Sequence, residues 1–236
     1  MLGPRRYAEL LMPVYEEAVP LHGLSGKRVL VQYKCIERCQ FGVFRTTERS
    51  FCGRGTTGTA TRQNGIEAMK ILTMVPIQSE LDFLLQAWAE KGFHTQTFMI
   101  GKLLVMHLPE LDVTLACGGL GKVQFAVQTQ YLLDVCPGWD LVICAGAAGV
   151  LVDGLSIGDV VVATETVEHD IHNKFGKSLL PRFGGAEIVV SALRSVLPLS
   201  SSFQVHFGPI ASGDEDVVDT DRKRMLHRRT GALAVA

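Results

Sequence analysis

Residues 69–91, MKILTMVPIQSELDFLLQAWAEK, carry the pattern that decides the fold. The run MKILTMV is short and almost uniformly apolar, which predicts a strand buried on both faces. Pro76 follows and favours the start of a helix, because proline is tolerated in the first helical turn. The next apolar residues recur at helical spacing and define one face: Ile77, Leu81, Leu84, Leu85 and Trp88. A buried strand that leads directly into an amphipathic helix indicates an α/β protein.

The same alternation continues from residue 92 to the end of the sequence. Further apolar runs predict strands at 102–108, 112–117, 140–145, 160–165, 203–211 and 231–236. Helical patterns lie between them at 118–134, 186–196 and 219–229. Strands that are apolar on both faces favour a largely parallel sheet that is covered by helices on each side.

Residues 1–68 differ from the rest of the chain in charge and composition. They contain ten Lys and Arg against six Asp and Glu, whereas the whole chain has a net charge of −1. The segment SFCGRGTTGTATRQNG (50–65) is rich in Gly and Thr and lacks periodicity, which is typical of a linker. We therefore expect a poorly ordered extension or leader at 1–68 and one folded domain at 69–236.

The overall composition excludes several functional classes. A net charge of −1 argues against a nucleic-acid-binding protein, because such proteins need a basic surface. No segment approaches the roughly 18 consecutive apolar residues of a membrane span. The N-terminal residues MLGPRRYAELLMPVYEEAVP contain no continuous apolar stretch of the kind found in signal peptides. We therefore expect a cytoplasmic protein without a nucleic-acid or membrane partner.

The six cysteines do not form the pattern of a small disulfide-stabilised protein. Three of them, Cys35, Cys39 and Cys52, lie near His22 and are the candidates for a zinc site. Their spacing contains no close ligand pair such as CxxC. We therefore expect no metal site.

Two glycine-rich segments follow predicted strands, CGGLGK (117–122) and AGAAG (145–149). Ligands of open α/β sheets bind at the carboxyl ends of the strands, where these segments lie. The first segment is not a P-loop, because Ala116 and Val123 stand where Gly and Ser or Thr are required. It is not a dinucleotide fingerprint either, because Gln124 stands where Gly or Ala is required. A tight turn remains the structural alternative for both segments.

Two further features point to the same edge of the predicted sheet. The segment ASGD (211–214) ends another predicted strand, and Glu80 lies one turn into the helix after the first strand. Backbone amides from the loops and a carboxylate from the helix could line one cleft. The sequence therefore predicts a small-molecule site at this edge.

Five segments together resemble a known family: MKILTMVPIQSEL, GGLGKVQFAVQTQYLL, AGAAGVL, GDVVVATETVEHD and ASGD. In their order and spacing they resemble the nucleoside phosphorylase superfamily over residues 69–236, and most closely its 5′-methylthioadenosine/S-adenosylhomocysteine nucleosidases. The resemblance implies a three-layer α/β/α sandwich around a twisted, largely parallel mixed sheet. It also implies a homodimer without a cofactor that uses water to cleave the N-glycosidic bond of an adenosine-like nucleoside.

The resemblance assigns roles to particular residues. Glu80 would hold the attacking water, Leu120 would line the ribose and its 5′ substituent, and the backbone of Val217 would bind adenine. The full set of expected substrate-binding residues is Gly119, Leu120, Ala148, Gly149, Ser212, Asp214 and Val217.

The sequence also departs from the family pattern. Family phosphorylases place arginines where this chain has residues 76–78 and 143–144, which contain none, so hydrolysis is favoured over phosphorolysis. Asp216 stands where the family stacks an aromatic ring on adenine, which leaves the exact nucleoside open, futalosine and an adenosyl-lipid included. A purine nucleoside phosphorylase and a non-catalytic nucleoside-binding protein remain the alternatives.

Three segments near the C-terminus complete the sequence-based expectations. The resemblance implies a structural or subunit-contact role for HDIH (169–172), with a metal site as the alternative. The basic helix DRKRMLHRR (221–229) is typical of a solvated surface. Beyond the strand matching 231–236, the family has a glutamate that binds the ribose and an aspartate that protonates the base. We therefore expect a C-terminally incomplete domain with weak or no activity.

Overall fold

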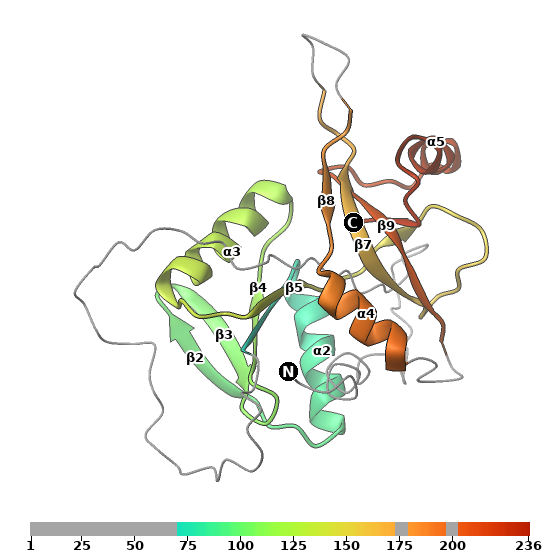
Figure 1. Cartoon of the computed structure of the whole chain (residues 1–236). Coiled ribbons are helices and arrows are strands. Elements are labelled where there is room, and N and C mark those ends of the chain that lie inside the picture. The colour runs from blue at the N-terminus through green and yellow to red at the C-terminus, as the bar shows by residue number, and fades with distance from the viewer. Residues whose placement is uncertain (1–69, 173–178, 197–202) are drawn as a thin grey trace.

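The computed structural model describes residues 70–172, 179–196 and 203–236 (Figure 1). The extension expected at 1–68, including the candidate zinc ligands, lies outside these ranges. Within them the strands and helices alternate broadly as the sequence predicts. No helix in these ranges has the length and the apolar character that crossing a lipid bilayer requires.

The first sheet has the strand order β2-β3-β4-β1-β5. Its strands are β1 (Ile71–Val75), β2 (Gln96–Ile100), β3 (Leu103–Leu108), β4 (Val113–Cys117) and β5 (Leu141–Cys144). Strand β1 lies between β4 and β5 and runs parallel to both, whereas β2 and β3 complete the sheet as antiparallel strands. Every residue of β1 is buried, as expected for the central strand of a sheet covered on both faces.

Helices cover both faces of this first sheet. Leu72 and Met74 of β1 pack in the cluster that includes Leu132 of helix α3 (Lys122–Val135). The alternate residues Ile71 and Val75 pack in a second cluster. That cluster also contains buried residues of helices α2 (Gln78–Glu90) and α4 (Glu187–Val196). The period of two along β1 therefore separates a layer formed by α3 from a layer formed by α2 and α4.

The second sheet has the strand order β6-β10-β9-β7-β8. Its strands are β6 (Gly149–Val150), β7 (Val160–Glu168), β8 (Arg182–Gly184), β9 (Val205–Ser212) and β10 (Ala234–Val235). Strand β9 runs parallel to both β7 and β10, and the register of β7 with β9 shifts between Ala163 and Thr166. The β7–β9 pairing extends to Glu168 and Ser212, so both strands end at the same edge.

Helix α5 (Thr220–Thr230) packs against the second sheet through Leu226, which is fully buried beside Ala211 and Val235. The helix begins at Asp219, whose side chain accepts a hydrogen bond from the backbone N–H of Arg222. It ends at Gly231, which has a φ of 73° and so adopts the left-handed conformation common after helices. Basic residues fill its last turn, as the basic pattern of 221–229 predicts for a helix with a solvated face.

The expected fold class is confirmed, because mixed sheets are covered by helices in the predicted order. One difference is that hydrogen bonding divides the strands between two five-stranded sheets. A second is that strands β2, β6 and β8 were not predicted. The first four residues of β2 and all three of β8 are exposed, and β6 has only two residues, so none is a strand buried on both faces, which is the kind that the apolar runs predict.

Candidate functional site

Three parallel strands of the first sheet end side by side. The register aligns Val75 with Cys117 and Met74 with Cys144. The N–H of Gly118 donates to the carbonyl of Val75 at 2.7 Å, and the N–H of Ala145 donates to the carbonyl of Met74 at 2.9 Å. Both glycine-rich loops therefore leave the sheet on either side of the end of β1, as predicted for a binding edge.

Glu80 lies at this edge, in the first turn of α2, and is partly buried. Its Oε1 accepts a hydrogen bond from the backbone N–H of Ala147 at 3.2 Å. A Cβ added to Gly146 would lie 2.8 Å from Pro76 Cδ and 3.0 Å from Glu80 Oε2. Only glycine allows the AGAAG loop to approach the carboxylate this closely, so the loop and Glu80 form one unit.

The loop at 118–121 depends on glycine for a different reason. Gly119 and Gly121 have φ values of 85° and 81°, which side chains other than glycine rarely adopt. Leu120 between them is 73% exposed, so an apolar side chain projects from the loop. Single exposed leucines are common on protein surfaces, and the position of this one beside the sheet edge is what makes it a candidate ligand contact.

Ala148 and Gly149 carry the second loop into the other sheet. Ala148 is buried beside Val150 and Ile210, and Gly149 begins β6, where it pairs with Val235 of β10. A Cβ at Gly149 would lie 3.3 Å from Val235 Cγ1. The AGAAG segment therefore starts beside Glu80 in the first sheet and ends in the second sheet.

The structure places the remaining predicted residues at the end of β9 and beyond. Ser212 is the last residue of β9, and its carbonyl accepts a hydrogen bond from the N–H of His169 at 3.0 Å. Asp214 Oδ1 accepts a hydrogen bond from the backbone N–H of Lys122 at 2.6 Å, so its carboxylate lies at the N-terminus of α3. The side chain of Val217 is buried under α5, which leaves its backbone as the part that a ligand could contact.

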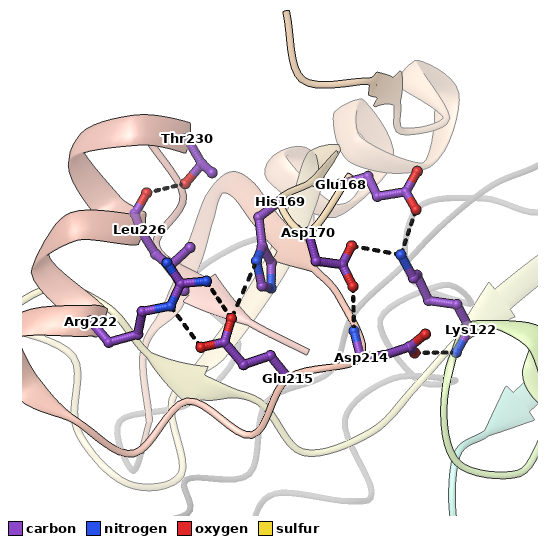
Figure 2. Close-up of polar contacts among 9 residues, drawn as sticks. All are labelled: Lys122, Glu168, His169, Asp170, Asp214, Glu215, Arg222, Leu226 and Thr230. Carbon is purple, nitrogen blue, oxygen red and sulfur yellow. Dashed lines mark hydrogen bonds and ion pairs between the residues drawn. The ribbon is translucent and has the colours of Figure 1, made fainter. Parts of the chain in front are cut away.

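An ionic cluster that we did not predict joins these segments (Figure 2). Lys122 Nζ donates to Glu168 Oε1 and to Asp170 Oδ1, each at 2.6 Å. The other oxygen of Asp170 accepts a hydrogen bond from the N–H of Asp214 at 2.8 Å. Burial alone would raise the pKa of Asp170, but the Lys122 ammonium and the Asp214 amide hold it below its usual value. Burial alone would lower the pKa of Lys122, and the two carboxylates raise it instead.

His169 precedes Asp170 of this cluster in the chain and is fully buried. Its Nδ1 is 4.0 Å from Glu215 Oε2, and Glu215 is in turn bound by the guanidinium of Arg222 (Figure 2). Burial lowers the pKa of His169, although the neighbouring carboxylates Asp170 and Glu215 oppose the shift. A Cβ at Gly213 would lie 2.4 Å from the ring Nε2, which explains the glycine of ASGD.

The structural role expected for the first two residues of HDIH agrees with these contacts, since His169 packs in the interior and Asp170 joins two loops. In the part of the chain that the structure describes, no three His, Cys, Asp or Glu side chains are grouped so that they could hold a metal ion. The subunit contact expected for the same segment stays a prediction.

Comparison with protein families identifies the superfamily to which this fold and these loops belong. The model of the phosphorylase superfamily matches residues 70–236. The chain belongs to the phosphorylase superfamily. The resemblance inferred from the five sequence segments is therefore confirmed.

The curated relatives that the chain matches include proteins with one shared name. The chain is 34% identical over 124 residues to the 5′-methylthioadenosine/S-adenosylhomocysteine nucleosidase of Thermotoga maritima. The aligned region covers 52% of this chain and 54% of that protein. It is 32% identical over 123 residues to the nucleosidase of the same name from an Exiguobacterium species. This alignment covers 49% of this chain and 52% of that protein. The chain thus spans about half the length of the curated relatives it matches.

Solved structures of the superfamily share the fold. The nucleosidase of S. pneumoniae with the transition-state inhibitor MT-ImmA is 26% identical, with a TM-score of 0.60 over 71% of this chain and 74% of that one. The Neisseria meningitidis nucleosidase in complex with methylthio-immucillin-A is 27% identical, with a TM-score of 0.57 over 71% and 75%. The superfamily fold therefore extends over nearly three quarters of this chain.

Proposed function

We propose that the site at Glu80 hydrolyses the N-glycosidic bond of an adenosine-like nucleoside of the 5′-methylthioadenosine or S-adenosylhomocysteine class. One observation carries this proposal. The Glu80 carboxylate is fixed by the N–H of Ala147 at the edge where two glycine-rich loops leave the sheet. The names of the relatives support the substrate class, because both curated proteins are 5′-methylthioadenosine/S-adenosylhomocysteine nucleosidases.

The proposed reaction suits a carboxylate at this position. The bond between the ribose C1′ and the base nitrogen breaks, while the oxygen of water bonds to C1′. Positive charge develops on the sugar in the transition state, and a nearby carboxylate stabilises it. In this proposal Glu80 orients the water and accepts its proton as the new bond forms, and the leaving base takes up a proton.

Three considerations favour water over phosphate as the nucleophile. The residues beside the ends of β1 and β5, at 76–78 and 143–144, include no arginine that could bind a phosphate dianion. The ammonium of Lys122, the last residue of the first glycine-rich segment, is bound by Glu168 and Asp170. A carboxylate at Glu80 would also repel phosphate.

The substrate-binding set is part of this proposal. Leu120 and the glycines around it would contact the ribose and its 5′ substituent. Ala148 and Gly149 would form the floor under the sugar and the base, since beside the second sheet Ala148 has only a methyl group and Gly149 has no side chain. The remaining contacts would come from the backbone after β9: Ser212, Asp214 and Val217.

A panel of nucleosides tests the reaction and its nucleophile together. The chain is incubated with methylthioadenosine, S-adenosylhomocysteine, adenosine, inosine and futalosine, each with and without phosphate, and free base is measured. Release of adenine from the 5′-thio nucleosides, at equal rates with and without phosphate, is the expected result. Phosphate-dependent release together with ribose 1-phosphate would identify a phosphorylase instead. Calorimetric binding of methylthio-immucillin-A without any turnover would identify a nucleoside-binding protein.

We further propose that the chain forms a homodimer, and one face of α3 supports this. Val123, Val127 and Tyr131 lie one turn apart on this helix and are 75%, 63% and 37% exposed. An apolar stripe on an exposed helix is typical of an interface. Light scattering after gel filtration tests the proposal. A dimer that Val127→Glu converts into a monomer is expected, and a monomeric wild-type chain would contradict it.

A cytoplasmic location belongs to the same proposal. Cys117 has a thiol at the proposed site, which a reducing compartment would keep reduced. Cell fractionation with a cytoplasmic marker tests this location, and recovery in the membrane fraction or the medium would contradict it.

A further inference from the structure

The Lys122 cluster forms a closed ring of interactions between the two sheets (Figure 2). The backbone N–H of Lys122 donates to Asp214, and the N–H of Asp214 donates to Asp170. Asp170 in turn accepts from the Lys122 ammonium, which closes the ring, and Glu168 accepts from the same ammonium. One residue of the first glycine-rich loop is thus attached at two points to segments that follow β7 and β9.

We propose that Lys122 is a positioning residue of the nucleosidase site, which fixes the spacing between the loop at 118–121 and the turn at 212–214. This inference rests on the proposed function, because it concerns two segments that are expected to contact the nucleoside. Lys122 acts through Asp170 and Asp214 and does not itself touch the reacting atoms.

The ring is more buried than an ordinary surface ion pair. Exposed pairs contribute little, because solvent screens them and holding two long side chains costs entropy. Here the side chains of Lys122, Glu168 and Asp170 are only 31%, 22% and 23% exposed. Both carboxylate oxygens of Asp170 are used, one by the ammonium and one by a backbone amide. Such a network restrains geometry more strongly than one contact does.

The start of α3 shows why the ring also controls the loop. The residue at the helix N-cap position is Gly121, which has no side chain to bind the first backbone amides. Asp214 supplies the missing carboxylate from the other sheet, and its Oδ1 would lie only 3.3 Å from a Cβ at Gly121. The conformation of the loop is therefore coupled to the position of the turn after β9.

Removal of the ammonium has a definite electrostatic consequence. Without Lys122 Nζ, the carboxylates of Glu168 and Asp170 face one another and Asp214 without a compensating cation, and they repel. The turn and the loop then separate, so substrate affinity falls while Glu80 keeps its own contact with Ala147. The expected signature is a KM that rises by roughly 10-fold or more, as for a lost charge-assisted hydrogen bond, with a much smaller change in kcat.

The first experiment compares the full chain with Lys122→Met, Lys122→Arg and the control Lys102→Met, which removes an exposed lysine in the turn between β2 and β3. KM, kcat and the Kd of methylthio-immucillin-A are measured for each. A Kd and KM raised about 10-fold in Lys122→Met, largely restored in Lys122→Arg and unchanged in Lys102→Met, is expected. Equal affinity in Lys122→Met and wild type would overturn the inference.

A ligand-free measurement separates this inference from the proposed function. Hydrogen exchange is followed for the amides of 119–123 and 212–215 in wild type and Lys122→Met. Faster exchange of both segments in the variant is expected. Unchanged exchange would show that Lys122 does not hold the two segments in place, and it would overturn the inference whatever the ligand data show. Absence of nucleoside and inhibitor binding by the wild-type chain would instead overturn the proposed function, and with it the role in substrate binding.

A double-mutant cycle excludes a general loss of stability as the cause. Asp170→Asn breaks the ring at its central carboxylate, so the double variant with Lys122→Met should bind the inhibitor no more weakly than either single variant. Independent effects that multiply in the double variant would show that Lys122 does not act through Asp170 and would overturn the inference.

Discussion

The two sheet edges that meet at the site are held by different interactions. At the first sheet, the backbone amides of Gly118 and Ala145 bind strand carbonyls, and Gly146 packs directly on Pro76 and Glu80. At the second sheet, the ends of β7 and β9 are joined to the first glycine-rich loop by charged side chains around Lys122 (Figure 2). The first edge is positioned mainly by steric fit and the second mainly by charge, although Gly213 also packs closely on His169 there.

This difference predicts how each edge responds to change. Steric fit is insensitive to pH, but it does not accept an added atom where rigid groups are already in contact. Charge pairs respond to protonation and to removal of one partner. Substitutions at the first edge should therefore act through chemistry and packing, and substitutions at the second edge should act through electrostatics.

The largest effect is expected for Glu80→Gln at the first edge. Glutamine keeps the oxygen that accepts the N–H of Ala147, so the loop stays in place, but it cannot accept a proton from water. We expect kcat to fall by about 10²–10⁴, the range for removal of a general base, with the melting temperature nearly unchanged. Adenine release from methylthioadenosine measures this change.

Glu90→Gln is the matched control, because it makes the same substitution at the exposed C-terminal end of the same helix. Equal kcat values for Glu80→Gln and wild type would remove Glu80 from the proposed mechanism.

Gly146→Ala tests the steric fit itself. The new Cβ would meet the rigid Pro76 ring at 2.8 Å and Glu80 at 3.0 Å, so the loop must move away from the carboxylate. We expect a loss of about 1–3 kcal/mol in the free energy of unfolding, together with reduced activity. Gly184→Ala is the control, since a Cβ there would have nothing within 4 Å. Urea denaturation that gives the same free energy for Gly146→Ala and wild type would contradict the steric account.

The first edge could largely be predicted from the sequence because local patterns encode it. A nearly uninterrupted apolar run identifies each of β1, β4 and β5 as a buried strand, and glycines after two of them mark loops at strand ends. The position of Glu80 at this edge follows from its place in the first turn of the helix that comes directly after β1. The division into two sheets was not predictable in this way, because strand pairing depends on contacts between distant residues.

The second edge could not be predicted because its contacts carry no periodicity. Lys122 meets Glu168, Asp170 and Asp214 across separations of 46, 48 and 92 residues. The sequence does contain one relevant signal. Lys122 is the only charged residue in GGLGKVQFAVQTQYLL, and Glu168 and Asp170 follow an apolar strand. Isolated opposite charges at the ends of buried elements could have indicated a pair, but not which carboxylate would bind which group.

A smaller effect is expected for Asp219→Ala, which removes the N-cap of α5 beside the second edge. The Asp219 side chain accepts the N–H of Arg222 at 2.8 Å, and alanine leaves that amide unsatisfied. We expect the free energy of unfolding to fall by about 1 kcal/mol. Asp221→Ala, two residues later at a side chain that is 90% exposed, is the control and should change stability less. Equal losses in the two variants, measured by thermal denaturation, would argue against a capping role.

The smallest effect is expected from the pH dependence that His169 gives to the second edge. Burial lowers its pKa in the folded chain below the value of 6.5 for the free side chain, so the folded state favours the neutral ring. The associated stability is complete above pH 6.5 and is lost as the pH falls through the lower folded pKa, because the unfolded chain then binds more protons. Asp170 and Glu215 oppose the shift and so reduce the effect, whereas the cations Arg222 and Lys122 add to it.

Replacement of His169 by an uncharged residue isolates this contribution. In His169→Leu and His169→Asn, the free energy of unfolding should depend less on pH between 5 and 7 than in wild type, whatever the absolute stability of each variant. Chemical denaturation at several pH values measures the slopes. Parallel slopes in all three chains would mean that His169 is not held neutral by burial. The response of the second edge to acid would then have to come from its carboxylates alone, whose protonation removes the acceptors of the Lys122 ring.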